Sequence, residues 1–205
     1  MATIYLSSTY SDLQEYREAV YRALRQMRHD VIAMEDYVAT DERPADKCLT
    51  DVAACEVYIG LFAWRYGYIP ATENPEQRSI TEMEYREAGT QNRPRLIFLL
   101  DDKAPWSPQL MDAVTGDGDN GARIKALRQE LTQEKLVSFF TTPDDLAKLV
   151  SIAIGRLEVK QGQPQSALLE ASNPLREAYL GWLIDQVRAV RLTGVDPKSV
   201  REENR

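Results

Sequence analysis

The apolar residues of this chain alternate between short continuous runs and positions three or four residues apart. Five runs rich in β-branched, aromatic and leucine side chains predict strands over residues 3–7, 31–35, 57–63, 95–100 and 137–140. Apolar residues at helical spacing follow each run and predict helices that begin near residues 13, 46, 79, 122 and 143. Because strands and helices alternate five times, the pattern predicts an α/β fold, with a five-stranded, mainly parallel sheet between two layers of helices.

Polar and aromatic side chains gather in the loops that follow the predicted strands. Right-handed crossovers place these loops at one edge of a parallel sheet, where open α/β sheets bind ligands. The loops contain Ser7, Ser8, Thr9, Glu35, Asp36, Trp64, Arg65, Tyr66, Asp101 and Asp102. We therefore expect the functional site at this edge, together with the start of the helix near residue 79.

The start of that helix is the most informative segment of the chain. Residues 79–88 run Ser-Ile-Thr-Glu-Met-Glu-Tyr-Arg-Glu-Ala, so Ser79 can cap the helix and Glu82 can complete a capping box. Glu84 follows in the first turns, and at the ligand edge of a sheet its carboxylate can stabilise a ribosyl cation or polarise a ribose hydroxyl. The alternative is a glutamate that faces solvent, and the pattern alone leaves both interpretations open.

The turn after the first strand also has two interpretations. The hydroxyl and N–H groups of residues 7–9 can cradle a phosphate at a helix N-terminus, although the glycines and lysine of a Walker loop are missing. The same residues fit a simple strand-to-helix turn capped by Ser11 or Asp12. Arg17, in the helix that follows, can reach back to an anion or pair with a neighbouring acid such as Glu35.

Trp64, Arg65 and Tyr66 follow the apolar run over residues 57–63. An exposed aromatic side chain there can stack on a base or a nicotinamide ring, and Arg65 can contact a phosphate or order the loop. The alternative is a packed aromatic corner. Gly67 is expected to adopt a positive φ in the turn.

Composition excludes several classes of function. The net charge of −7 argues against non-specific binding to nucleic acid or to an anionic membrane. One histidine and two cysteines, Cys48 and Cys55, make a metal site or a Ser-His-Asp triad a poor hypothesis. No apolar run approaches about 18 residues, and the chain starts on a strand without a signal peptide, so we expect a cytoplasmic protein that does not insert into a membrane.

The C-terminal part of the chain differs in composition from the rest. Residues 161–173 are rich in Gln, Gly, Pro and Ser and predict a linker after a domain over residues 1–160. Residues 174–192 have apolar positions at helical spacing and end before Gly194, and the charged residues 198–205 follow. A connector helix and tail over residues 174–205 suggest that the natural protein continues into a further module.

Several segments together resemble the family called domain of unknown function 4062. The similar segments, over roughly residues 3–160, are residues 4–19, 46–49, 57–60, 65–67 and 79–88. The resemblance implies a flavodoxin-like fold related to TIR domains and nucleoside deoxyribosyltransferases, enzymes that cleave N-glycosidic bonds. The catalytic Glu of the deoxyribosyltransferases lies in a Thr-x-x-Glu-x-x-x-Ala motif, and Thr81, Glu84 and Ala88 fit it. Glu84 is therefore the catalytic candidate.

The resemblance also implies a biological role. Members typically precede STAND-type NTPases with NACHT modules, so the implied function is an effector domain, often in antiviral defence, that hydrolyses NAD+ or a related nucleotide on oligomerisation. NAD+ is then a substrate, and no cofactor or metal is expected. The predicted substrate-binding residues are Ser7, Ser8, Thr9, Arg17, Glu35, Trp64, Arg65, Tyr66 and Thr81. Two alternatives stay open: a non-catalytic TIR-like domain that self-associates and signals, and a nucleoside deoxyribosyltransferase.

Overall fold

A parallel sheet forms the centre of the domain. The computed structural model describes residues 1–37, 44–116 and 118–162, and the first compact unit comprises Met1–Gly155. The five strands of this unit are β1 (Thr3–Ser8), β2 (Asp30–Ala33), β3 (Val57–Phe62), β4 (Arg95–Leu100) and β5 (Ser138–Phe140). They pair in the order β2-β1-β3-β4-β5, and every pair is parallel. This is the doubly wound order of flavodoxin-like folds, so the predicted α/β sandwich is confirmed.

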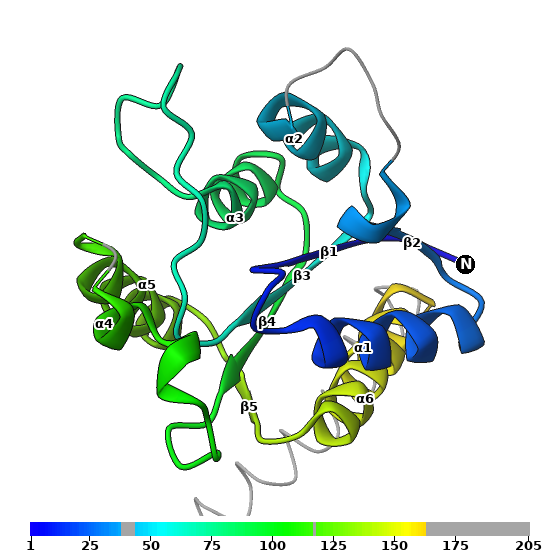
Figure 1. The fold of residues 1–205 in the computed structure, drawn as a ribbon. Helices are drawn as coiled ribbons and strands as arrows, with labels where there is room; N and C mark the ends of the chain where they lie inside the picture. Colours follow the sequence, from blue (N-terminus) through cyan, green and yellow to red (C-terminus); the bar gives the residue numbers. More distant parts are fainter. Residues whose placement is uncertain (38–43, 117, 163–205) are drawn as a thin grey trace, which may run out of the picture. The chain divides into compact units, whose positions relative to one another are not determined.

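Helices cover both faces of the sheet (Figure 1). Helix α1 (Gln14–Gln26) and the part of α6 (Pro143–Gly162) that belongs to the first unit lie on one side. The other side carries α2 (Pro44–Ala54), α3 (Ile80–Thr90) and α5 (Asn120–Glu134). The one-turn elements are η1 (Met34–Asp36), η2 (Pro108–Leu110) and α4 (Asp112–Thr115).

The core follows from the alternation of side chains along the strands. All six residues of β3 are buried, which confirms a strand covered on both faces. Tyr5, Tyr58 and Phe62 pack with side chains of α2, α3 and α5 in one cluster. The residues between them point to the opposite face, where α1 and α6 lie. The buried residues on this face are Ile4, Leu6, Ile59 and Leu61 of the strands, Val20 and Leu24 of α1, and Leu146 and Val150 of α6.

Two predicted segments differ from the structure. The second strand, expected over residues 31–35, is Asp30–Ala33, because the chain enters η1 directly. The loop expected over residues 101–121 contains η2, α4 and the first residues of α5. Single turns are too short to show a helical period, so the sequence pattern missed them.

The predicted cap of the first helix was also wrong. Leu13 takes the N-cap position of α1, and no side chain there accepts a capping hydrogen bond. Leu13 is completely buried, so packing rather than capping by Ser11 or Asp12 fixes this helix start.

The C-terminal part of the chain and the lengths of the helices complete the description of the fold. Apart from the last two residues of α6, the linker predicted over residues 161–173 and the connector helix over residues 174–205 lie outside the described residues. None of the helices in the described part of the chain combines the length and the apolarity needed to cross a bilayer.

Gly60 in the middle of β3 tests the tightness of this packing. A Cβ atom at Gly60 would lie 2.7 Å from Phe62 Cε2 and 2.9 Å from Tyr58 Cε1. We expect Gly60→Ala to lower the free energy of unfolding in urea by about 1–3 kcal/mol, because buried rings must move. At Gly155 in α6, nothing in the described structure lies within 4 Å of the added atom. Gly155→Ala should therefore stabilise the protein by about 0.5–1 kcal/mol, and a loss at Gly155 as large as at Gly60 would contradict this packing.

Candidate functional site

A cavity of about 600 Å³ opens beside the carboxyl end of β1. The loops after β1, β2 and β3 line it together with the first turns of α2 and α3. Open α/β sheets bind ligands at this edge, and the volume lies in the range of small-molecule sites. The cavity therefore lies at the edge of the sheet where the sequence analysis expected a site.

Glu84 is buried and borders this cavity. Its side chain projects from the first turns of α3 toward β1 and is only 5% exposed. The Tyr5 hydroxyl donates to Glu84 Oε1 at 2.7 Å, and the Ser7 hydroxyl donates to Oε2. The interpretation of Glu84 as a solvent-facing residue is therefore excluded.

Burial, hydrogen bonds and the charge of Arg17 together set the pKa of Glu84. Within the described residues, no Lys or Arg side chain forms an ion pair with Glu84. Burial raises the pKa of Glu84, and the hydrogen bonds from Ser7 and Tyr5 offset part of that rise. When ionised, Glu84 makes the inner end of the cavity negative, which suits a group on which positive charge develops.

Arg17 is a cation whose charge lowers the pKa of Glu84, and it is itself paired with another acid. Its guanidinium is 1% exposed and donates from Nε and Nη2 to the two carboxylate oxygens of Glu35, both at 2.6 Å. Nη1 donates to the Ser8 hydroxyl at 2.9 Å and to the Leu6 carbonyl at 3.4 Å. Burial raises the pKa of Glu35, but the hydrogen bonds and the charge of Arg17 outweigh it, so the net shift is downward. Arg17 therefore pairs with an acid, as one of the two interpretations of the sequence had it, although it also borders the cavity.

Tyr5, Tyr37 and Cys48 line the same cavity, and sequence reasoning missed all three. The hydroxyl oxygens of Tyr5 and Tyr37 lie 3.5 Å apart. Burial and the charge of Glu84 raise the pKa of the Cys48 thiol to about 11, so this thiol is neutral at physiological pH. One signal for Tyr5 existed: a tyrosine on a buried strand needs a partner for its hydroxyl.

Arg65 reaches the cavity from the loop after β3. Its Nη1 donates to the Ser11 hydroxyl at 3.1 Å, and its Nε lies 3.4 Å from Asp112 Oδ1. Asp112 is buried, lines the cavity and accepts the Tyr66 N–H at 2.7 Å. No local pattern pointed to Asp112, because it follows Tyr66 by 46 residues.

The structure brings most predicted site residues together. Those that line the cavity are Glu84, Ser7, Ser8, Thr9, Arg17, Arg65 and Thr81. Glu35, Trp64 and Tyr66 are not among the lining residues of the cavity. Glu35 holds Arg17, and the Trp64 ring lies 3.9 Å from the guanidinium carbon of Arg128.

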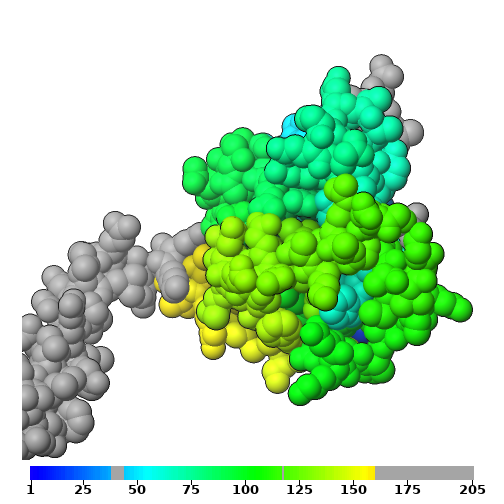
Figure 2. Space-filling view, turned by 90° about the vertical axis from the view of Figure 1, so that its left-hand side faces the viewer, coloured from blue at the N-terminus to red at the C-terminus, as the bar shows by residue number. Residues whose placement is uncertain are grey.

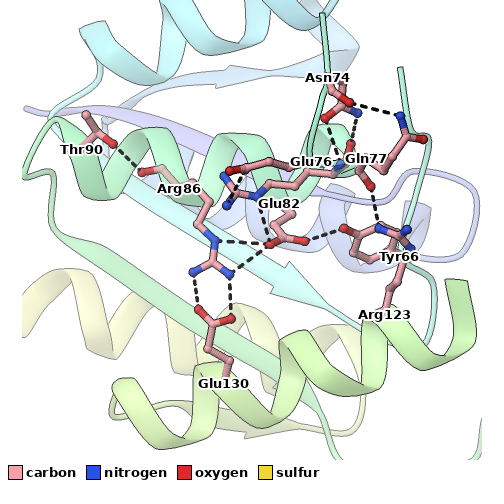
Figure 3. A network of polar contacts seen from close by, with 10 residues as sticks. Tyr66, Asn74, Glu76, Gln77, Glu82, Arg86, Thr90, Arg123 and Glu130 are labelled. Carbon is pink, nitrogen blue, oxygen red and sulfur yellow. Dashed lines mark hydrogen bonds and ion pairs between the residues drawn. The ribbon is translucent and has the colours of Figure 1, made fainter. Parts of the chain in front are cut away.

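Tyr66 belongs to a network on the outer side of α3 (Figure 3). Its hydroxyl donates to Glu82 Oε2 at 2.5 Å, and Arg86 Nη2 donates to Glu82 Oε1 at 3.0 Å. Arg86 also makes a two-pronged ion pair with Glu130 of α5, in which Nη2 lies 2.7 Å from Oε2. The predicted capping box is thus half formed: Ser79 Oγ accepts the Glu82 N–H, but the Glu82 carboxylate binds Tyr66 and Arg86.

Helix α5 fixes the loop before α3 as well. Arg123 donates to the Gln77 carbonyl at 2.8 Å, and the Asn74 side chain closes the loop through Arg78. Figure 2 shows the face of the first unit on which α5 and the segment between β4 and α5 are exposed, drawn in green to yellow-green. The outer side of α3 is therefore held by polar contacts, while its inner side presents Glu84. Nowhere in the described ranges do three His, Cys, Asp or Glu side chains gather in a way that could hold a metal ion.

The Arg86–Glu130 pair allows a measurement of how firmly α5 holds α3. A double-mutant cycle with Arg86→Ala and Glu130→Ala should give a coupling free energy of about 1 kcal/mol in urea unfolding, because the pair is two-pronged and only about a third exposed. The exposed Arg22–Glu18 pair of α1 is the control, with an expected coupling of about 0.3–0.5 kcal/mol. Equal couplings would mean that the network adds nothing to the attachment of α3.

Burial of Glu84 should make the free energy of unfolding depend on pH. The pKa of Glu84 is raised in the folded state. Protonation of Glu84 therefore stabilises the folded protein, fully so below the ordinary carboxyl pKa. This contribution to the free energy of unfolding is lost as the pH rises through the folded-state pKa. Glu84→Gln keeps an acceptor for Tyr5 and removes the charge. The stability of this variant relative to wild type should increase from pH 4 to pH 8 in urea titrations. A difference that shrinks over this range would show that the ionised form is the better accommodated one.

Comparison with known proteins gives several matches. A protein of Mus musculus described as telomerase protein component 1 is 24% identical, in a match that covers 66% of this chain and 6% of that protein. This chain therefore corresponds to a small part of that relative. The structure of the CMP N-glycosidase BcmB of Clostridium botulinum matches with a TM-score of 0.44 and 9% identity, over 74% of this chain and 98% of that one.

A second solved structure contains the TIR domains of the activated Roq1 resistosome, which recognises the pathogen effector XopQ. It matches with a TM-score of 0.41 and 11% identity, over 74% of this chain and 85% of that chain. The family model described as domain of unknown function (DUF4062) matches residues 3–155, which include every strand of the sheet and the whole lining of the cavity. The chain belongs to the DUF4062 family.

Proposed function

We propose that this domain cleaves the N-glycosidic bond of NAD+ or a related nucleotide, with Glu84 as the catalytic carboxylate. The observation that carries the proposal is the buried Glu84 carboxylate, which borders an open cavity and is held by two hydroxyl groups without a cation. An acid in this setting is suited to a reaction that develops positive charge beside it.

The proposed reaction has a simple balance. The bond from ribose C1′ to the base nitrogen breaks, and its electron pair leaves with the base, which for NAD+ departs as neutral nicotinamide. The remaining ribosyl group is cationic, and the Glu84 carboxylate stabilises it, as carboxylates do in glycoside cleavage. Water then adds to C1′ and releases a proton. Tyr5 and Ser7 fix the orientation of the carboxylate through their hydrogen bonds.

The geometry favours an enzyme over a domain that only self-associates. A purely scaffolding domain would be expected to have a closed cleft, with Glu84 paired outward to a cation. The cavity is instead open, and Glu84 accepts hydrogen bonds from the two hydroxyls of β1 without forming an ion pair among the described residues. We further propose that the domain is an effector module of a larger STAND-type protein, active on oligomerisation. The mouse relative, in which the match covers 6% of the length, is likewise a much larger protein.

Loss of NAD+ in the presence of the purified protein at high concentration tests the proposal. Glu84→Gln should lower turnover by about 10²–10³-fold, because the charge that stabilises the ribosyl cation is lost. Glu87→Gln makes the same change on the same helix, outside the cavity, and should retain wild-type turnover.

Three outcomes separate the alternatives. Full activity of Glu84→Gln would overturn the assignment of the catalytic residue. Transfer of a 2′-deoxyribosyl group to an added free base, with no loss of NAD+, would favour the deoxyribosyltransferase. Absence of turnover even when the domain is clustered through a fused oligomeric partner would favour a non-catalytic signalling domain.

A further inference from the structure

Exposed apolar side chains gather at the mouth of the cavity. Tyr10, Met34 and Tyr68 are 42%, 49% and 71% exposed, and all three line the cavity. They come from the segments that follow β1, β2 and β3, so three separate loops contribute to one rim. Large apolar side chains that are exposed next to one another often mark a ligand-binding or protein-binding surface.

The cavity therefore has two ends of different chemistry. Its inner end presents the Glu84 carboxylate with the Ser7 and Tyr5 hydroxyls, all buried. Its rim presents two aromatic rings and a thioether. Within the described residues, neither the Tyr10 hydroxyl nor the Tyr68 hydroxyl has a protein hydrogen-bond partner. Both rings are thus available to a ligand.

A nucleotide has the same two-ended chemistry. Its ribose carries hydroxyl groups and the bond to be cleaved, and its base is a flat aromatic ring. We propose that the nucleotide binds with its ribose toward Glu84 and its base toward the rim, where Tyr10 and Tyr68 contact the base by stacking and Met34 by apolar packing. This orientation rests on the proposed function, because the cleaved bond must lie beside Glu84.

The orientation replaces the predicted base-binding residues. Trp64 packs against Arg128, and Tyr66 is bonded to Glu82, so neither ring borders the cavity. Stacking is tolerant of base identity, since every base offers an aromatic face. The site should therefore bind nucleotides that carry different bases, with the sugar held toward Glu84.

Binding to the full chain carrying Glu84→Gln tests the orientation without turnover. Titration calorimetry with NAD+, AMP and UMP should give dissociation constants that differ by less than about tenfold. Adding Tyr68→Leu or Tyr10→Leu should raise each constant about tenfold, the loss of one stacked ring, whereas Tyr68→Phe should leave it unchanged. Ribose 5-phosphate lacks a base, so its binding should not respond to Tyr68→Leu. Phe139→Leu changes an exposed aromatic residue of β5 away from the cavity and is the control.

Several results would overturn the orientation. The first is that no nucleotide binds, and the second is that Tyr68→Leu weakens the binding of ribose 5-phosphate as much as that of AMP. The third is that Tyr68→Leu changes the association state in sedimentation and leaves nucleotide binding unchanged. The last result would mean that the rim is a protein interface. The two proposals can fail separately. Binding that depends on Tyr68 in a wild-type chain without turnover supports the base site alone, whereas turnover with a KM that Tyr68→Leu leaves unchanged supports the reaction alone.

Discussion

The cost of burying charge is the constraint on which this structure depends. The carboxyl ends of the parallel strands leave carbonyl groups without strand partners, and two buried arginines bind them. Arg17 bonds the Leu6 carbonyl of β1 and neutralises itself on Glu35, while Arg128 bonds the carbonyls of Phe62 and Leu100 at the ends of β3 and β4. Each guanidinium also has a carboxylate partner, as buried charges require. Glu84 lies at the same edge and forms no ion pair among the described residues, and that difference gives the cavity its chemistry.

Helix α3 meets two opposite requirements along one short segment. Its outer side holds Glu82 in contact with Tyr66 and Arg86, and through Arg86 with α5. Its inner side places Glu84 against the hydroxyls of β1. Polar bonds on the outer side fix the rotation of the helix about its own axis, so the buried carboxylate keeps its orientation without a cation beside it. Packing alone would fix this rotation less well, because apolar contacts have no direction.

Periodicity was enough to predict the fold but not all of the site. The strands, the parallel sheet and the helix that carries Glu84 follow from patterns that span a few residues, such as the apolar run of β3 and the Ser79 cap. The residues that were missed depend on contacts between distant segments. Asp112 meets Tyr66 across 46 residues, and Tyr5 meets Glu84 across 79. Trp64 and Tyr66 follow a buried strand in either interpretation, and only the positions of Arg128 and Glu82 in space decide that they pack instead of lining the cavity.

The energetics of Glu84 bear on whether the domain is an enzyme. Burial disfavours the ionised form of Glu84 and raises its pKa, while hydrogen bonds and the charge of Arg17 offset only part of that cost. A site that must stabilise a cation gains directly, because a cation partner for Glu84 would cancel the field that the reaction needs. The lack of an ion pair at Glu84 among the described residues is therefore consistent with the proposed cleavage of a nucleotide.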